Sequence, residues 1–175
     1  MREGEFLQRC SGLRYREYRL TPVSLYLCGD DNSLTCAVFS RNPAEVEIIM
    51  ARAVRGDTAP IIEAVHFLDE YLVRRNAPLP SLDLRGYTER EQRIYSALLT
   101  IPPGSVISYG GLAEKAGFPR GGRFAGNAMA KNRFPVFIPC HRVIQSSGKT
   151  GNYTSGKDIK EYLLAHEQGE WFHSI

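Results

Sequence analysis

One cysteine in this sequence has neighbours that could make its thiol react. Cys140 lies in the run "PCHRV", where His141 and Arg142 follow it directly, and the glycine-containing stretch "SSGKTGNY" comes soon after. A thiol attacks as its thiolate, and a neighbouring base or cation is the usual way to raise the thiolate fraction. The residues therefore indicate a nucleophilic cysteine. A cysteine that only packs in the core is the alternative that they leave open.

The segment that must position Cys140 is the apolar run "FPVFIPCHRVI", residues 134–144, which predicts a buried β-strand. Adjacent side chains of a strand point to opposite faces. Contact between Cys140 and His141 would therefore need a local bend in the strand or a bridging water.

Residues 108–132 predict two short helices joined by a tight turn, which is the helix-turn-helix arrangement. Ser108 is a typical N-cap and Gly117 a typical helix end, and the spacing of Ala113 and Gly117 lets crossed helices approach. The second helix, roughly residues 121–131, carries glycine and alanine along one face, although each glycine costs up to about 1 kcal/mol there. Close approach to a DNA groove would compensate, and packing against another helix is the alternative.

The charge of the chain is unevenly distributed. Residues 109–160 contain nine Lys and Arg against two Asp and Glu, or +7, so the rest of the chain is −4 within a net charge of +3. A basic half on a nearly neutral protein favours a polyanionic partner such as DNA. A solvated lysine-rich face would give the same count.

The remaining pattern predicts an α/β (α+β) protein of two domains, residues 1–80 and 81–175. Short β-rich runs over residues 13–50, with the turn "GDDN", predict a small antiparallel sheet. A helix is expected over 61–75 after Pro60, and another over 88–101, where Thr88 and Glu91 can form a capping box. The proline-containing segment "NAPLPSLDLRG" between them predicts the linker.

Composition excludes several classes of protein. The content of 43% hydrophobic and 23% charged residues is typical of a globular protein. No apolar run of roughly 18 residues is present, so no membrane association is expected. Its charged start, "MREGEFLQRC", is unlike a signal peptide, so an intracellular location is expected. Cys10, Cys28 and Cys36 form no C-x-x-C pair, which favours apolar packing over a metal site.

The run "PCHRV", with "SYGGLA" 31 residues upstream and "LLAHE" downstream, resembles the O6-alkylguanine-DNA alkyltransferases. These are suicide DNA repair proteins, which move an alkyl group from guanine onto their own cysteine. The resemblance is dense from about residue 84 to residue 167 and faint over the first 80 residues. It implies a ribonuclease-H-like N-terminal domain without catalytic residues and a C-terminal domain with a winged helix-turn-helix.

By this resemblance, Cys140 is the alkyl acceptor. His141 acts as its base through water, Glu167 polarises His141, and Asn132 orders the turn before the active site. Tyr109 protonates the leaving guanine and pushes the 3′ phosphate, while Arg123 replaces the extruded nucleotide in the stack. The residues expected around the base and the DNA are Pro135, Arg142, Val143, Tyr153, Thr154, Ser155, Ala125 and Gly126.

The resemblance further implies a partner, double-stranded DNA containing O6-alkylguanine, with O4-alkylthymine as a second candidate lesion. No cofactor and no metal are expected, and the protein is expected to act as a monomer that could cluster along DNA, in the cytoplasm or the nucleus. The sequence departs from the family at Phe124, expected to face the core, at Arg133, expected to add a charge near DNA, and at Ser155. Serine adds bulk at the pocket rim, so benzyl-type substrates are expected to react more slowly than methyl lesions.

Three alternatives remain at this point. A cysteine hydrolase could use Cys140 and His141, but it would lack an evident oxyanion loop and would not need the helix-turn-helix. An alkyltransferase-like recognition protein would share the fold, although those relatives lack the acceptor cysteine. A helix-turn-helix regulator with a redox-sensing thiol is the third.

Overall fold

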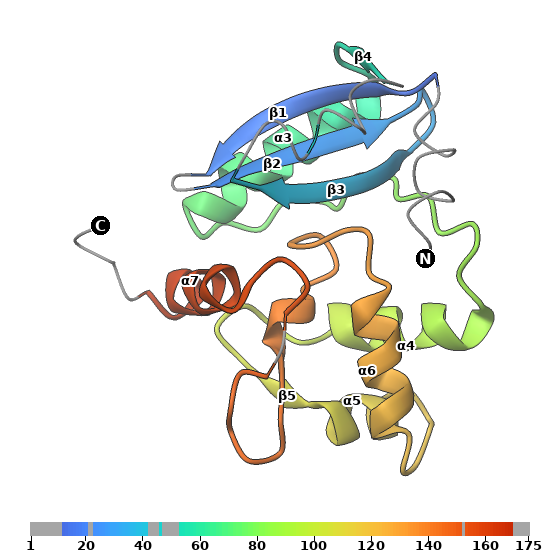
Figure 1. Ribbon diagram of the computed structural model, residues 1–175, viewed down its shortest axis with the longest axis vertical. Helices are drawn as coiled ribbons and strands as arrows, with labels where there is room; N and C mark the ends of the chain where they lie inside the picture. The colour runs from blue at the N-terminus through green and yellow to red at the C-terminus, as the bar shows by residue number, and fades with distance from the viewer. Residues whose placement is uncertain (1–11, 21–22, 42–45, 47–52, 152, 170–175) are drawn as a thin grey trace. The chain divides into compact units, whose positions relative to one another are not determined.

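The computed structural model describes residues 12–20, 23–41, 46, 53–151 and 153–169 (Figure 1). The chain divides into two compact units, Met1–Leu84 and Arg85–Ile175. The boundary lies a few residues after the predicted one because part of the expected linker pairs with the first unit. The backbone of Leu34 donates to Ser81 O at 2.7 Å and accepts from Asp83 N at 2.8 Å.

The first unit contains a four-stranded sheet in the order β3-β2-β1-β4. Its strands are β1 (Arg14–Leu20), β2 (Val23–Gly29), β3 (Leu34–Ser40) and β4 (Val54–Arg55). The first three are antiparallel neighbours, and β4 pairs with β1 in parallel. The "GDDN" turn joins β2 to β3 as predicted, because Asp30 Oδ1 accepts from the backbone N–H groups of Asn32 and Ser33. The predicted strand over 45–51 lies outside the described residues apart from Val46, which is buried but helical, so the strand prediction is wrong at that residue.

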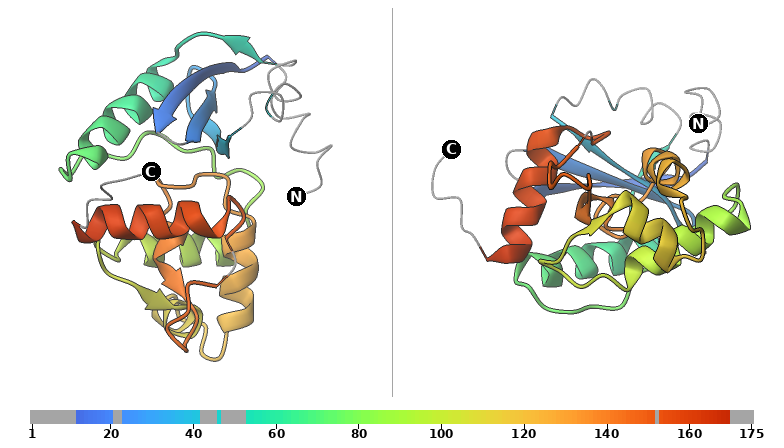
Figure 2. Two further views of the ribbon diagram at one scale, coloured as in Figure 1. Left: turned by 60° about the vertical axis from the view of Figure 1, so that its left-hand side comes forward. Right: turned by 90° about the horizontal axis from the view of Figure 1, so that it is seen from below.

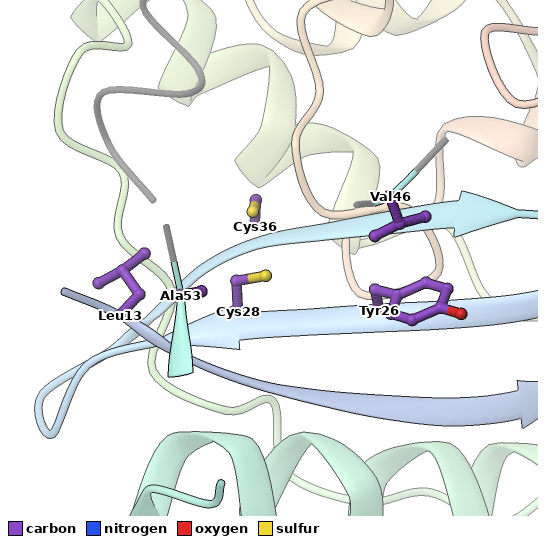
Figure 3. Close-up of a cluster of buried hydrophobic side chains, with 6 residues drawn as sticks. All are labelled: Leu13, Tyr26, Cys28, Cys36, Val46 and Ala53. Carbon is purple, nitrogen blue, oxygen red and sulfur yellow. The ribbon is translucent and has the colours of Figure 1, made fainter. Parts of the chain in front are cut away.

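Helix α3 (Ala59–Leu72) lies along this sheet in both views of the ribbon (Figures 1 and 2). It begins with Pro60 in its first turn, as predicted, and buries Ile61, Ala64 and Leu68. Strand β2 is buried along both of its faces, so Leu25 and Leu27 alternate with Tyr26 and Cys28. Tyr26 and Cys28 join a cluster with Leu13, Cys36, Val46 and Ala53 (Figure 3).

Cys28 and Cys36 are therefore apolar core residues, as predicted, and they are direct cross-strand partners. Cys10 lies outside the described residues. Among the residues that are described, no group of three or more His, Cys, Asp or Glu side chains could hold a metal ion. No helix in this same part of the chain is both long enough and apolar enough to cross a membrane.

The second unit is mainly helical. Its elements are α4 (Glu89–Leu99), β5 (Ile107–Ser108), α5 (Tyr109–Lys115), α6 (Gly122–Ala130), the 3-10 turn η1 (Cys140–Arg142), β6 (Val143–Ile144) and α7 (Lys157–Gln168). The predicted capping box at the start of α4 is present, because Thr88 and Glu91 bond each other's backbone N–H groups. The predicted N-cap of α5 is also present, since Ser108 Oγ accepts from Gly111 N at 3.0 Å.

The prediction of a β-strand over residues 134–144 is wrong for most of the run. Only Val143–Ile144 are strand, paired in parallel with Ile107–Ser108, and Cys140–Arg142 form a 3-10 turn. Pro135 and Pro139 cannot donate backbone hydrogen bonds, and Val136 has a positive φ of 72°. The apolar residues of the run are nevertheless buried as a strand would bury them. The 3-10 turn bends the chain at Cys140, and a contact between Cys140 and His141, directly or through water, stays a prediction.

Candidate active site

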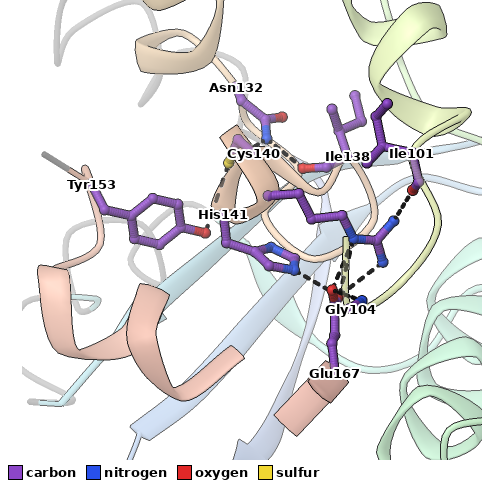
Figure 4. Close-up of polar contacts among 9 residues, drawn as sticks. Ile101, Gly104, Asn132, Ile138, Cys140, His141, Tyr153 and Glu167 are labelled. Atoms are coloured by element: carbon purple, nitrogen blue, oxygen red, sulfur yellow. Dashed lines mark hydrogen bonds and ion pairs between the residues drawn. The ribbon is translucent and has the colours of Figure 1, made fainter. Parts of the chain in front are cut away.

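Cys140 lies at the start of the 3-10 turn and is 8% exposed. The side-chain amide of Asn132 donates to Cys140 Sγ at 3.0 Å, and Tyr153 Oη lies 3.7 Å from the same sulfur (Figure 4). Burial raises the pKa of the thiol, while the hydrogen bonds from Asn132 and Tyr153 and the charge of Lys160 oppose that rise. The resting thiol is therefore protonated at neutral pH, and it reacts as a nucleophile only if a base accepts its proton.

Such a base is next to it in the chain. His141 is fully buried, and its Nε2 lies 2.7 Å from Glu167 Oε1 (Figure 4). A carboxylate beside Nε2 favours the tautomer that carries the proton there, which leaves a lone pair on Nδ1. That Nδ1 is buried and has no hydrogen-bond partner among the described residues. Because burial lowers the pKa of His141, against the opposing effect of Glu167, the ring is neutral at pH 7 and can accept a proton.

Glu167 is held from three sides. Arg142 donates to both of its oxygens through Nε and Nη2, and Gly104 N donates to Oε2 at 3.0 Å. Burial raises the pKa of Glu167, but the hydrogen bonds from His141 and Arg142 outweigh burial and hold the pKa well below its ordinary value. The carboxylate is thus ionised throughout the physiological range and keeps the tautomer of His141 constant.

Arg142 is an internal residue bound within the site itself, and its predicted place around the base and the DNA stays a prediction. Its guanidinium grips Glu167, its Nη1 donates to Ile101 O at 2.6 Å, and the residue is 7% exposed. Arg133 is internal as well, and the expectation that it adds a charge near DNA stays a prediction. Both arginines are held by partners within the unit, because a buried cation is stable only when it is hydrogen-bonded.

Lys160 is a site residue that sequence reasoning missed. It is fully buried, its Nζ donates to Val143 O at 2.6 Å and to Thr150 O, and it lies 5.9 Å from the centre of the Tyr153 ring. Burial lowers the pKa of Lys160, while Cys140 raises it. The spacing on α7 was a usable signal, because Lys160 precedes Glu167 by two helical turns and so shares its buried face.

The predicted helix-turn-helix has an inner and an outer side. A Cβ added at Gly122 would lie 3.4 Å from Gly110 Cα of α5, and Ala125 and Ala128 are fully buried. These small residues serve helix packing, which was the alternative to an approach to DNA, and a role of this face in DNA binding stays a prediction. The outer side of α6 instead presents Arg123, which is exposed.

Tyr109 belongs to this pair of helices and is close enough to Cys140 for the two side chains to interact electrostatically. It is the first residue of α5, directly after the short strand that pairs with Val143 and Ile144. A Cβ added at Gly126 would lie 3.9 Å from the Tyr109 ring, so the two residues are neighbours. Burial raises the pKa of the Tyr109 phenol, and the charge of a Cys140 thiolate raises it further. The hydroxyl therefore keeps its proton at neutral pH.

Phe124 is half-buried rather than part of the core. Its ring meets that of Phe118 edge-on at 5.5 Å, and the Arg90 guanidinium covers it at 4.8 Å. The cluster closes the outside of the turn between α5 and α6. Arg93 completes it by stacking on Phe118 at 4.6 Å and donating to Ala116 O.

The other predicted pocket residues differ in exposure. Pro135 and Val143 are buried, Tyr153 and Ser155 are half-buried, and Thr154 is exposed. The backbone of Val143 is engaged, since its N–H donates to Cys140 O and its carbonyl accepts from Lys160. The structure thus brings Cys140, Asn132, His141, Tyr153 and Glu167 together.

Known proteins are similar to this chain over the unit that contains the site. A family model described as 6-O-methylguanine DNA methyltransferase, DNA binding domain, matches residues 89–169. The methylated-DNA–protein-cysteine methyltransferase of Mycobacterium leprae is 41% identical over 114 residues, which cover 65% of this chain and 68% of that protein. The chain belongs to the methylated-DNA–protein-cysteine methyltransferase family. The resemblance drawn from "PCHRV" and its companions is thereby confirmed.

Other members of the methyltransferase family agree with this assignment. The human member is 39% identical over 129 residues, which cover 70% of this chain. The aligned part spans 62% of the human protein and 57% of the rat protein, so it covers less than two thirds of either. Among solved structures, Mycobacterium tuberculosis OGT in complex with DNA superposes with a TM-score of 0.75 at 33% identity, covering 90% of this chain and 94% of that one. The mixed α/β fold with a small sheet is confirmed by this likeness.

Proposed function

We propose that this protein repairs O6-alkylguanine in duplex DNA by transferring the alkyl group irreversibly to Cys140. The thiolate attacks the alkyl carbon, the carbon–oxygen bond to guanine breaks, and a thioether forms on the protein. A thioether is a very poor leaving group, so each molecule acts once. The observation that carries the proposal is a thiol hydrogen-bonded to Asn132 beside a buried His141–Glu167 pair, in a member of this family.

His141 is the base in this proposal, acting through a bridging water. Its neutral ring has Nδ1 available, and Glu167 stabilises the imidazolium that forms after proton transfer. Asn132 then donates to the sulfur as negative charge develops on it. Tyr109 gives its proton to the departing guanine, so that the base leaves without full negative charge.

The lesion would reach Cys140 by nucleotide flipping, because an alkyl group inside a duplex is out of reach. In the proposed complex the winged helix-turn-helix enters the minor groove, Arg123 fills the gap in the stack, and Gly126 allows close approach. The +7 charge over residues 109–160 and the exposure of Arg123 support DNA as the partner. The related OGT of Mycobacterium tuberculosis has been solved in complex with DNA.

The flipped base would be enclosed by Pro135, Val143, Tyr153, Thr154 and Ser155, and O4-alkylthymine is a second candidate substrate. The first unit would be a ribonuclease-H-like domain that supplies no catalytic residue. We further propose that the protein acts as an intracellular monomer, without cofactor or metal, and that clustering along DNA is a second mode to test.

Intact-mass measurement tests the proposal directly. The protein is mixed with duplex DNA containing one O6-methylguanine, beside a Cys140→Ser variant and a Cys28→Ser variant that keeps the proposed acceptor. We expect the wild type and Cys28→Ser to gain one methyl group, mapped to Cys140, and Cys140→Ser to gain none. Tight binding of the lesion with no mass change would instead make this a recognition protein of the alkyltransferase-like kind.

A further inference from the structure

The hydroxyl of Tyr87 makes three hydrogen bonds that the proposed chemistry does not use. It donates to Lys131 O at 3.0 Å and accepts from both the backbone N and the side-chain Nε of Arg133, each at 3.0 Å. One donor and two acceptor positions are the full capacity of a hydroxyl. Burial raises the pKa of Tyr87, although Arg133 opposes that rise, so the hydroxyl keeps its proton and can donate.

Arg133 joins this arrangement as a buried cation. Its guanidinium lies over the Tyr87 ring at 4.6 Å and near the Phe134 ring at 5.5 Å, and its Nη2 donates to Arg85 O at 3.1 Å. The residue is only 6% exposed. A planar guanidinium can stack and donate in several directions at once, which a lysine ammonium cannot do.

Asn132 lies between Lys131 and Arg133, the two residues that Tyr87 bonds. Tyr87 bonds the residue before it and the residue after it, so the backbone that carries Asn132 is gripped on both sides. The orientation of the Asn132 side chain is also fixed, by three hydrogen bonds. Its amide nitrogen donates to Ile138 O at 2.8 Å and to Cys140 Sγ at 3.0 Å, while its oxygen accepts from Phe134 N at 2.9 Å.

Helix α4 also contacts the residues that precede Asn132. Lys131 Nζ donates to Glu91 Oε1 at 2.6 Å, and Tyr95 Oη donates to Ala128 O near the end of α6. The rings of Tyr87 and Tyr95 meet edge-on at 5.0 Å. A continuous set of contacts therefore runs from the start of α4, through the end of α6, to the sulfur.

We infer that Tyr87 and Arg133 are positioning residues that hold Asn132 against Cys140 Sγ and thereby increase the reactivity of the thiol. The inference rests on the proposed role of Cys140 as alkyl acceptor. Neither residue contacts the sulfur in this role, since both act through the geometry of Asn132. A hydrogen bond to a charged acceptor depends steeply on distance and angle, so a small shift of Asn132 weakens its support of the thiolate.

Other titratable groups also act on Cys140 or adjoin it in the chain, and the test must leave them unchanged. They are Tyr95 on α4, Tyr109 on α5, His141 beside it, Tyr153 in the loop before α7, and Lys160 on α7. Tyr87→Phe removes one hydroxyl and keeps all of these groups, as well as the aromatic ring beneath Arg133. Arg133→Lys keeps the positive charge but removes the stacking and the bonds of Nε and Nη2.

The test is the pH dependence of Cys140 alkylation by iodoacetamide, followed by peptide mass mapping without DNA. In Tyr87→Phe we expect the rate at pH 8 to fall about ten-fold and the profile to move up by about one pH unit, as for one unit of thiol pKa. Arg133→Lys should shift the profile in the same direction. Tyr18→Phe is the matched control, because it removes a hydroxyl that bonds Asp69 in the first unit, and it should leave the profile unchanged.

The direction of change separates positioning from general support of the fold. Loosened packing would expose the thiol and accelerate its alkylation, so an unchanged or faster rate in both variants overturns the inference. Combining Tyr87→Phe with Asn132→Ala gives a second check, because the two effects should not add if they share one route. Additive effects would also overturn it. Since iodoacetamide needs no DNA, failure of alkyl transfer from DNA leaves these outcomes readable and is recognised separately.

Discussion

The surroundings of Cys140 and the outer side of α6 lie in the same unit but follow opposite physical rules. Around Cys140, charged groups are buried, and each of Glu167, Arg142 and Lys160 has several close partners. On the outer side of α6, Arg123 is exposed to solvent. Buried networks shift pKa values and tolerate no missing partner, whereas exposed charges act over a distance and are screened by salt. Chemistry and recognition should therefore be separable by substitution.

Glu167→Ala should give the largest effect, because it leaves His141 and the Arg142 guanidinium without their buried carboxylate. Removing one partner of a buried ion pair costs about 3–5 kcal/mol. We expect a loss of that size in the free energy of unfolding, measured with urea, together with loss of alkyl transfer.

Glu161→Ala is the control for this change, since Glu161 lies on the same helix but pairs with Lys157 on the surface. Such an exposed pair contributes about 0.5 kcal/mol at most. Equal losses in the two variants would remove the distinction between the two regions.

Arg123→Ala tests the other side of the comparison. We expect transfer from duplex DNA to slow about a hundred-fold, because stabilising a flipped nucleotide is worth a few kcal/mol. The reaction with free O6-benzylguanine should be unchanged, as no duplex is opened. Arg19→Ala, at an exposed arginine of the first unit, should affect neither rate. A parallel fall in both reactions of Arg123→Ala would mean that Arg123 supports the thiol site instead.

Acid should weaken the buried site at moderate pH. The folded pKa of His141 is below its ordinary value of 6.5, and that of Glu167 is below 4.5. In both cases the unfolded chain binds the proton more readily, so the stability from His141 falls as the pH drops below about 6.5, and that from Glu167 falls as it drops below about 4.5. For each such proton the slope is at most about 1.4 kcal/mol per pH unit.

Unfolding curves between pH 7 and pH 3.5 would measure this slope. Glu167→Gln should show a shallower loss below pH 4.5 than the wild type, because the glutamine cannot be protonated there. The same slope in both proteins would show that other carboxylates, such as Glu91, govern the acid sensitivity.

Ser155→Gly should give the smallest effect. Ser155 is half-buried at the proposed pocket rim, and removing its side chain makes room for a larger alkyl group. We expect inactivation by O6-benzylguanine to accelerate a few-fold, while transfer from O6-methylguanine in DNA stays the same. Identical benzyl rates for wild type and variant would show that Ser155 does not limit the pocket.

Local features of this fold could be predicted because neighbouring residues decide them. The capping box of Thr88 and Glu91, the N-cap at Ser108 and the first-turn proline at Pro60 all depend on residues within one helical turn. The antiparallel hairpin at "GDDN" is equally local. The special character of Cys140 was also visible, since its proposed base is its immediate neighbour in the chain.

Other features depend on residues that are distant in the sequence. The run 134–144 has the composition of a strand, but its prolines and the positive φ of Val136 direct it into a 3-10 turn. The small-residue face of α6 fits helix packing and DNA approach equally well as a pattern, and only the position of Gly110 shows that Gly122 packs against α5. The burial of Arg142 and Arg133 could not be predicted, because charge alone does not show where a long side chain finds its partners.

By itself, the sequence determined the family and the order of the predicted helices and indicated Cys140 as the candidate nucleophile, because these depend on residue types at short spacings. Only the tertiary structure decided that Lys160 is buried near Cys140, that Tyr87 bonds the residues on both sides of Asn132, and that Arg142 shares Glu167 with His141. These contacts join residues 17 to 46 positions apart in the chain. Long-range hydrogen bonds form only after the core brings their backbones together, and composition or periodicity does not specify which residues then meet.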